Sequence, residues 1–342
     1  MCADIAALVL GCEGTALTAA ERDFFRDANP LGFILFRRNI DDPDQVRGLV
    51  ADLRDCVGRK APVLIDQEGG RVARLRGPHW PELPAARAVG NIPDAAAAIR
   101  AAWLHGRLLA AMLADLGIDV DCAPVADVPV PGAHDVIGDR AFAMEPSRVA
   151  DMAGAQAAGL MAGGVLPVVK HLPGHGRAFA DSHKELPVVA TPRPTLDVWD
   201  FAPFKALSAL PAGMVAHVVF SDIDPDLPAS VSPHVITSII RDHIGFDGLL
   251  FSDDLSMQAL SGTVGQRAAA VLAAGCDIAL HCNGQMAEMR DVVDNARPMD
   301  GAAQRRWTVA AGAMAVPADR VDMGALRVEL DGLLSTGRAG EG

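Results

Sequence analysis

The sequence predicts an α/β protein folded as a single-domain (β/α)8 TIM-like barrel, and three observations support this. Eight short apolar segments alternate with longer amphipathic ones along the 342 residues, which is the pattern of parallel βαβ units. No Gly-x-Gly-x-x-Gly follows the first apolar segment, which argues against an open dinucleotide-binding sheet. Polar residues collect directly after the apolar segments, where closure into a barrel would bring them around one mouth.

The expected strands are short apolar segments flanked by turn or polar residues. They are Ile5 to Leu10, Gly32 to Phe36, Pro62 to Ile65, Asp119 to Cys122, Leu166 to Val169, Gly213 to Ala216, Leu249 to Phe251 and Asp277 to His281. Helix starts are expected at the capping box Thr18 to Glu21 and at Asp42, which precedes a proline. Further helices are expected over Ala95 to Leu116, Pro146 to Ala162 and Gln266 to Ala274.

Composition narrows the function classes. Half the residues are hydrophobic, so a disordered protein is excluded. The net charge of −13 argues against nucleic acid or an anionic membrane as partner. Tyrosine is absent, so we expect a polar pocket that grips a small ligand by hydrogen bonds. No segment approaches the roughly 18 apolar residues of a membrane helix. No linker divides residues 1–342, so one domain is expected, with helical packing and a tail from about residue 298.

The six cysteines are scattered without Cys-x-x-Cys spacing. We therefore expect reduced, buried thiols in a reducing compartment. The segment Val9 to Cys12 superficially resembles a lipoprotein cleavage site, but no basic region precedes it. It is better interpreted as the first barrel strand, and the expected location is cytoplasmic.

The segment Val168 to Gly176, followed by Asp181-Ser182-His183, is the most informative part of the chain. Asp181 can orient the His183 ring and support its protonated form, which suits a proton donor that later acts as a base. A turn cap at Asp181 beside an exposed His183 remains an alternative for this tripeptide alone.

Lys170 and His171 end an apolar strand that cannot easily bury them without partners. They suit hydrogen bonding to substrate hydroxyls or anions, and ion pairing within the barrel mouth is the alternative. His175 lies between Gly174 and Gly176, where it could support the loop or contact substrate.

A second segment, Gly248 to Met257, delivers Asp253 and Asp254 at the end of a strand. Neighbouring side chains on a strand point in opposite directions, so one carboxylate is expected to face the pocket and the other to brace the loop or cap a helix. An ionised carboxylate at this place could act as a nucleophile.

Asp66 also follows a strand, and Arg74 follows the glycine turn after it. Asp66 could accept two hydrogen bonds from neighbouring hydroxyls of a ligand while Arg74 donates to the same ligand, or the two could form an ion pair. Arg140 is a further candidate donor, although its local sequence alone suits a surface arginine.

Together these segments resemble the β-N-acetylhexosaminidases of glycoside hydrolase family 3, of the single-domain NagZ type used in bacterial cell-wall recycling. The resemblance rests on ordered motifs that span most of the chain: Ile34 to Asn39, Asp66 to Val72, Lys170 to Gly176, Asp181 to His183, Ala216 to Val218 and Phe251 to Met257. Leu172 stands where the family usually has phenylalanine.

The resemblance implies a retaining glycosidase without metal or organic cofactor. In it Asp253 attacks the anomeric carbon, and His183, partnered by Asp181, serves as acid and then base. It implies substrate-binding roles for the matching residues Asp66, Arg74, Arg140, Lys170 and His171. The implied substrate is a muropeptide with terminal β-linked N-acetylglucosamine (GlcNAc), joined to anhydro-N-acetylmuramic acid and cleaved by a monomeric enzyme.

Three alternatives stay open from the sequence. Phosphate could replace water as the acceptor, because a neutral base repels an anion less than a carboxylate does. A metal-dependent barrel hydrolase could use His171, His175 and His217 with an aspartate, although His-x-x-x-His on a loop is a weak signal. A sugar-binding protein without turnover is the third.

Overall fold

The chain folds around a parallel β-sheet that curls into a barrel. The computed structural model describes residues 4–178, 186–314 and 321–338. Within these ranges the main sheet has the order β5-β4-β3-β2-β1-β11-β10-β8-β6, with parallel neighbours throughout. Its strands are β1 (Ala6–Gly11), β2 (Pro30–Leu35), β3 (Val63–Ile65), β4 (Val120–Asp121), β5 (Leu166–Pro167), β6 (Val169–Leu172), β8 (Ala212–Val215), β10 (Leu249–Asp254) and β11 (Ile278–His281).

The barrel closes through the segment 166–172, which Val168 divides into β5 and β6. β5 pairs with β4, and β6 pairs with β8. The Val168 N–H donates to the carbonyl oxygens of Asp121 at 2.9 Å and Ala123 at 3.0 Å, so the segment stays bonded across the break. The nine strands of this sheet in the described residues therefore fill eight positions. This confirms the predicted (β/α)8 barrel.

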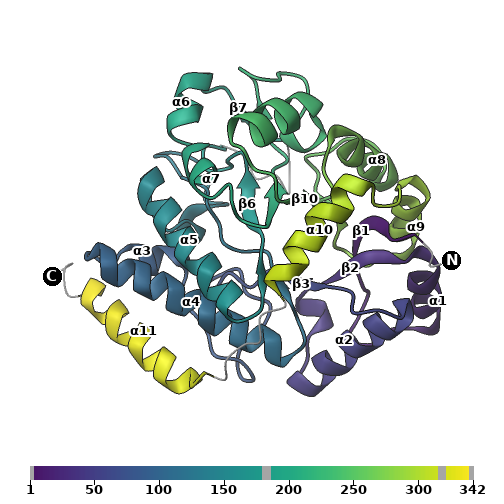
Figure 1. Cartoon of the computed structure of the whole chain (residues 1–342), viewed down its shortest axis with the longest axis horizontal. Helices are drawn as coiled ribbons and strands as arrows, with labels where there is room; N and C mark the ends of the chain where they lie inside the picture. The colour runs from purple at the N-terminus through teal and green to yellow at the C-terminus, as the bar shows by residue number, and fades with distance from the viewer. Residues whose placement is uncertain (1–3, 179–185, 315–320, 339–342) are drawn as a thin grey trace.

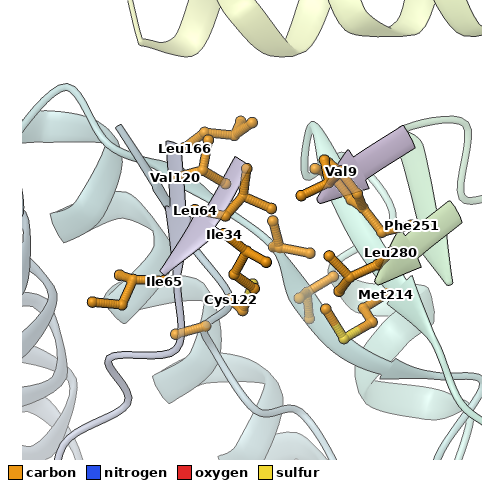
Figure 2. Close-up of a cluster of buried hydrophobic side chains, with 14 of the residues drawn as sticks. Val9, Ile34, Leu64, Ile65, Val120, Cys122, Leu166, Met214, Phe251 and Leu280 are labelled. Atoms are coloured by element: carbon orange, nitrogen blue, oxygen red, sulfur yellow. The ribbon is translucent and has the colours of Figure 1, made fainter. Parts of the chain in front are cut away.

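The barrel interior is packed with apolar side chains from strands distant in sequence. Figure 2 shows Val9, Ile34, Met214, Phe251 and Leu280 gathered in one buried cluster, and each is at most 3% exposed. Such packing resists rearrangement, because removing a buried side chain leaves a cavity that costs several kcal/mol. The strand ends are therefore held firmly enough to position side chains at the mouth.

Helices surround the strands (Figure 1). They are α1 (Ala19–Ala28), α2 (Pro43–Val57), α3 (Ala86–Gly90), α4 (Ala95–Asp115), α5 (Pro146–Ala162), α6 (Arg193–Val198), α7 (Ala202–Ala206), α8 (Val264–Ala274), α9 (Met286–Asn295), α10 (Gly301–Ala313) and α11 (Met323–Arg338). The predicted caps are present: Thr18 forms a capping box with Glu21, and Asp42 accepts from the N–H groups of Asp44 and Gln45, each at 2.9 Å. Asp94 caps α4 by accepting from the Ala97 N–H at 2.8 Å. Gly117 follows α4 with a φ of 77°, a conformation that glycine adopts readily.

The N-terminal ends of the strands are covered by α10, which crosses them in Figure 1. Arg306 of α10 contacts Asp247, which precedes β10, at 2.9 Å, and Asp277, which precedes β11, at 3.0 Å. Farther along the chain, α11 packs against α4. This leaves the C-terminal ends of the strands as the open mouth.

Each of the eight expected strands overlaps an observed one. The small sheet of β7 (Val188–Val189) and β9 (Val219–Phe220) and the π-helix Val235–His243 were not predicted. Cys12, Cys122, Cys276 and Cys282 are buried free thiols, as expected, whereas Cys56 is partly exposed. None of the helices in the described ranges is both long and apolar enough to cross a bilayer.

Candidate active site

A pocket of about 230 Å³ opens at the C-terminal ends of the strands. Its floor includes Ile34, Met214 and Leu280, which also belong to the barrel core. Six of the predicted site residues line it together: Asp66, Arg74, Arg140, Lys170, His171 and Asp253. The fold therefore brings together side chains that are separated by up to 187 positions in the sequence.

Asp181 and His183, the expected proton-transfer pair, lie outside the described residues. The chain leading to them leaves the pocket at His175, which lines it. Ala178 donates its N–H to the His175 carbonyl at 3.1 Å and accepts from His134 N–H at 2.9 Å. A Cβ on Gly176 would lie 2.1 Å from the Val128 carbonyl oxygen, so glycine permits this close approach.

Lys170 lies at the centre of a buried charge network. Its Nζ is 2.8 Å from Asp66 Oδ1 and 2.8 Å from Glu68 Oε1. Arg74 Nη2 lies 2.9 Å from Asp66 Oδ2. Arg140 donates two hydrogen bonds to Glu68, from Nε to Oε2 and from Nη2 to Oε1, each 2.8 Å long. This is the bidentate geometry in which the planar guanidinium group matches a carboxylate.

These contacts set the charge states of the network. Burial alone would raise the pKa of the Asp66 carboxyl, but Lys170 and Arg74 hold it well below its ordinary value. Burial is likewise outweighed at Glu68, where Arg140 and Lys170 lower the pKa to about 2. Burial opposes the charge on Lys170, yet Asp66 and Glu68 raise its pKa. All three groups are therefore charged at neutral pH.

The two interpretations left open for Asp66 and Lys170 are compatible, because both residues form ion pairs and still line the pocket. The suggestion that Arg140 is a surface residue is wrong: its side chain is 12% exposed and bound to Glu68. Glu68 itself was missed as a site residue. Its position two residues after Asp66 was the available signal, since alternate residues in an extended chain share a face.

Asp253 and Asp254 have different surroundings. Asp254 accepts from the N–H groups of Ser256 at 3.0 Å and Cys282 at 3.1 Å, and from the Ser256 hydroxyl. It therefore braces the loop, as predicted for one of the pair, although it also borders the pocket. Asp253 Oδ1 accepts from the Asp254 N–H at 2.8 Å. Within the described part of the chain, its Oδ2 accepts no hydrogen bond.

The electrostatic environment keeps Asp253 ionised. Burial opposes its charge, but His171, His217, the Asp254 N–H and Lys170 together lower its pKa below the ordinary value. An ionised carboxylate that lines a pocket, and of which one oxygen accepts no hydrogen bond from the described residues, is available for reaction with an electrophilic carbon.

Asp127 supports His171 from outside the pocket. Its Oδ2 lies 2.6 Å from His171 Nδ1, and its Oδ1 accepts from the His175 N–H at 2.7 Å. The rings of His171 and His175 meet edge to face with centroids 5.6 Å apart. Asp127 was not predicted as a site residue, because its place in the loop after β4 carries little local signal.

His217 has both ring nitrogens engaged. Nδ1 lies 2.7 Å from the Ser230 hydroxyl and Nε2 lies 3.1 Å from the Asp254 carbonyl oxygen. The residue is fully buried and supports the strand end behind Asp253. Across the described ranges, no group of three or more His, Cys, Asp or Glu side chains is arranged to hold a metal ion. The arrangement postulated for a metal-dependent hydrolase, with His171, His175 and His217 as ligands, is not formed.

Comparison with known proteins decides the family. The sequence profile of the glycosyl hydrolase family 3 N-terminal domain matches residues 9–309. The chain belongs to glycosyl hydrolase family 3. It is therefore a glycoside hydrolase, and the family resemblance found in its motifs is confirmed.

Relatives of this family 3 enzyme cover most of its length. A β-hexosaminidase of Alkalilimnicola ehrlichii is 41% identical over 284 residues, which are 81% of this chain and 80% of that protein. A β-hexosaminidase of Pseudomonas aeruginosa is also 41% identical, over 81% of this chain and 82% of that protein. The solved structure of NagZ from Neisseria gonorrhoeae in complex with N-trifluoroacetyl-D-glucosamine has a TM-score of 0.86 and 34% identity, covering 97% of this chain and 98% of that one.

Proposed function

We propose that this family 3 enzyme is a retaining exo-β-N-acetylglucosaminidase that removes terminal β-linked GlcNAc from muropeptides. The observation that carries the proposal is Asp253, an ionised carboxylate at the end of β10 that lines a pocket rich in hydrogen-bonding groups. The β-hexosaminidase relatives and the N-trifluoroacetyl-D-glucosamine complex of a structural neighbour support an amino sugar as substrate.

The charged network suits the binding of a terminal sugar. Asp66 can accept hydrogen bonds from sugar hydroxyls, while Arg74, Arg140 and Lys170 can donate them. Because these groups already hold one another in place, little side-chain entropy is lost when the sugar binds. The proposal assigns substrate binding to these four residues and His171.

Chemistry begins with attack of Asp253 on the anomeric carbon. As the new C–O bond forms, the bond to the leaving oxygen breaks, and protonated His183 gives that oxygen its proton. A glycosyl ester of Asp253 and the free aglycone result. His183 then takes a proton from water, the water oxygen attacks the anomeric carbon, and Asp253 is released with net retention of configuration.

The charge states of pocket residues in the described ranges support His183, which lies outside these ranges, as the general acid. A general acid must carry a proton at working pH. The pKa values of Asp66 and Glu68 are held too low by their cations for either to do so. Burial lowers the pKa of His175 to about 4, so this ring is neutral at pH 7. These charge states favour His183, oriented by Asp181, as the proton donor.

The proposed enzyme acts as one catalytic domain, with helical packing after about residue 298, and as a monomer in the cytoplasm on imported cell-wall fragments. Purified protein should be incubated with chitobiose and with a GlcNAc-anhydro-N-acetylmuramic acid peptide, with and without phosphate. Mass spectrometry should show free GlcNAc from the muropeptide in both conditions. GlcNAc 1-phosphate would redirect the proposal to a phosphorylase, the second candidate, because a neutral His183 base would tolerate an anionic acceptor.

A further inference from the structure

Asp127 is a fully buried carboxylate that lies behind the pocket and does not line it. Its two carboxylate oxygens contact two pocket residues, His171 and His175. Its Oδ2 is 2.6 Å from His171 Nδ1, and its Oδ1 accepts from the main-chain N–H groups of His171 at 3.3 Å and His175 at 2.7 Å. The hydrogen bonds that link Asp127 to the pocket therefore run through these residues.

The short contact to Nδ1 fixes the position of one proton. Burial would raise the pKa of Asp127, but the His171 ring that contacts it and the hydrogen bond from the His175 N–H lower it below its ordinary value. A carboxylate ion has acceptor sites and no donor. The hydrogen bond therefore requires the proton to be on Nδ1 of His171.

The opposite nitrogen of His171 faces a donor. Its Nε2 lies 3.5 Å from Arg140 Nη2, and that guanidinium nitrogen is itself 2.8 Å from Glu68 Oε1. A guanidinium has donors and no acceptor site. Placing a second proton on Nε2 would direct two N–H groups at each other, so the geometry favours a lone pair there.

We propose that Asp127 is a positioning residue that holds His171 in its Nδ1–H form, so that Nε2 exchanges its long 3.5 Å contact with Arg140 for a hydrogen bond from one hydroxyl of the bound sugar. This inference rests on the proposed substrate-binding role of His171. Arg74, Arg140 and Lys170 can only donate, and Asp66 is already bound by two cations. His171 Nε2 thus provides an acceptor that selects a sugar carrying a donor hydroxyl at one position.

Asp127→Asn is the most informative variant because it preserves shape. Its amide oxygen can still accept from the main-chain N–H groups, while its amide nitrogen donates to Nδ1 and drives the proton to Nε2. The matched control is Asp121→Asn, which alters another buried carboxylate whose Oδ1 accepts from the Gln67 N–H at 3.0 Å. Thermal unfolding of each variant should show that it folds.

The tautomer is measured on ligand-free protein by ¹⁵N–¹H correlation spectra of labelled histidine side chains, with His171→Gln used for assignment. Wild type and Asp121→Asn should show a protonated Nδ1 at His171, and Asp127→Asn should show a protonated Nε2. A protonated Nε2 in the wild type would overturn the proposal, whether or not the enzyme has activity.

The consequence for substrate is measured with aryl GlcNAc glycosides fluorinated at position 3, 4 or 6, because fluorine replaces the hydroxyl without supplying a donor. In the wild type one position should lose roughly 10-fold or more in kcat/KM relative to its parent. In Asp127→Asn that ratio should approach one, while the ratios at the other positions stay unchanged. A merely structural role would lower all substrates alike, and equal ratios in both enzymes would overturn the proposal. A protonated Nδ1 in a wild-type enzyme that hydrolyses no GlcNAc glycoside would contradict the proposed function and leave the tautomer assignment supported.

Discussion

The Lys170 ammonium of β6 lies 2.8 Å from Asp66 Oδ1, although the two residues are 104 positions apart in the chain. The contact joins the residue that follows β3 to the second residue of β6 at the barrel mouth. The same ammonium lies 2.8 Å from Glu68 Oε1, so Glu68 depends on this cation as well. The charged part of the pocket is therefore a single network of interdependent groups.

Lys170→Met should destabilise the fold and weaken substrate binding together. Removing the cation leaves two buried carboxylates short of a partner, which costs about 3 kcal/mol or more. Urea unfolding should show a lower midpoint, and KM should rise. The control is Arg26→Met, which breaks an exposed pair with Asp23 in which the side chains are 60% and 68% exposed. Equal stability of Lys170→Met and wild type would show that the network is not needed for folding.

Acid should destabilise the enzyme in a pH range set by Glu68. The folded-state pKa of Glu68 is about 2, below its ordinary value of 4.5. The unfolded chain therefore binds more protons between these values, so the stabilisation is complete above about pH 4.5 and is lost as the pH falls toward 2. The free energy of unfolding of Glu68→Gln should fall less steeply than that of the wild type across this range. Identical slopes would contradict the charged state assigned to Glu68.

Gly176→Ala should impair activity more than its small size suggests. The added Cβ would lie 2.1 Å from the Val128 carbonyl oxygen, so the backbone leading toward His183 must shift. Overpacking of this kind costs about 1–3 kcal/mol, and kcat should fall. Gly14→Ala is the control, because a Cβ there meets no atom within 4 Å. Wild-type kcat and stability in Gly176→Ala would show that this close approach does not position the loop.

His183→Ala should affect substrates according to their leaving groups. With an unactivated substrate such as chitobiose, loss of the general acid should reduce kcat/KM by about 100-fold or more. An activated aryl glycoside should lose much less, since its leaving group departs without a proton. The comparison uses both substrates with wild type and variant, and losses of equal size would remove His183 from the acid role.

The sequence predicted the barrel strands well because each is an apolar segment with polar residues at its end, a pattern that is local. It did not predict β7 and β9, two-residue strands that pair with each other in a separate small sheet outside the barrel pattern. The pocket residues recognisable from sequence were those directly after strands, such as Asp66 and Lys170. Arg140 was predicted as a candidate donor, but its burial was not evident from its local sequence because its partner Glu68 lies 72 positions away. Asp127 was missed because its partner His171 lies 44 positions away.

The central claim, that Asp253 is the nucleophile, is tested most directly by trapping the glycosyl enzyme. The wild-type enzyme should be incubated with a mechanism-based fluorosugar of GlcNAc, digested, and sequenced by tandem mass spectrometry. Asp253→Ala, which should fold and lack turnover, serves as the control and should remain unlabelled. The account predicts one covalent sugar on the carboxylate of Asp253 in the wild type; a sugar attached to any other residue would contradict it.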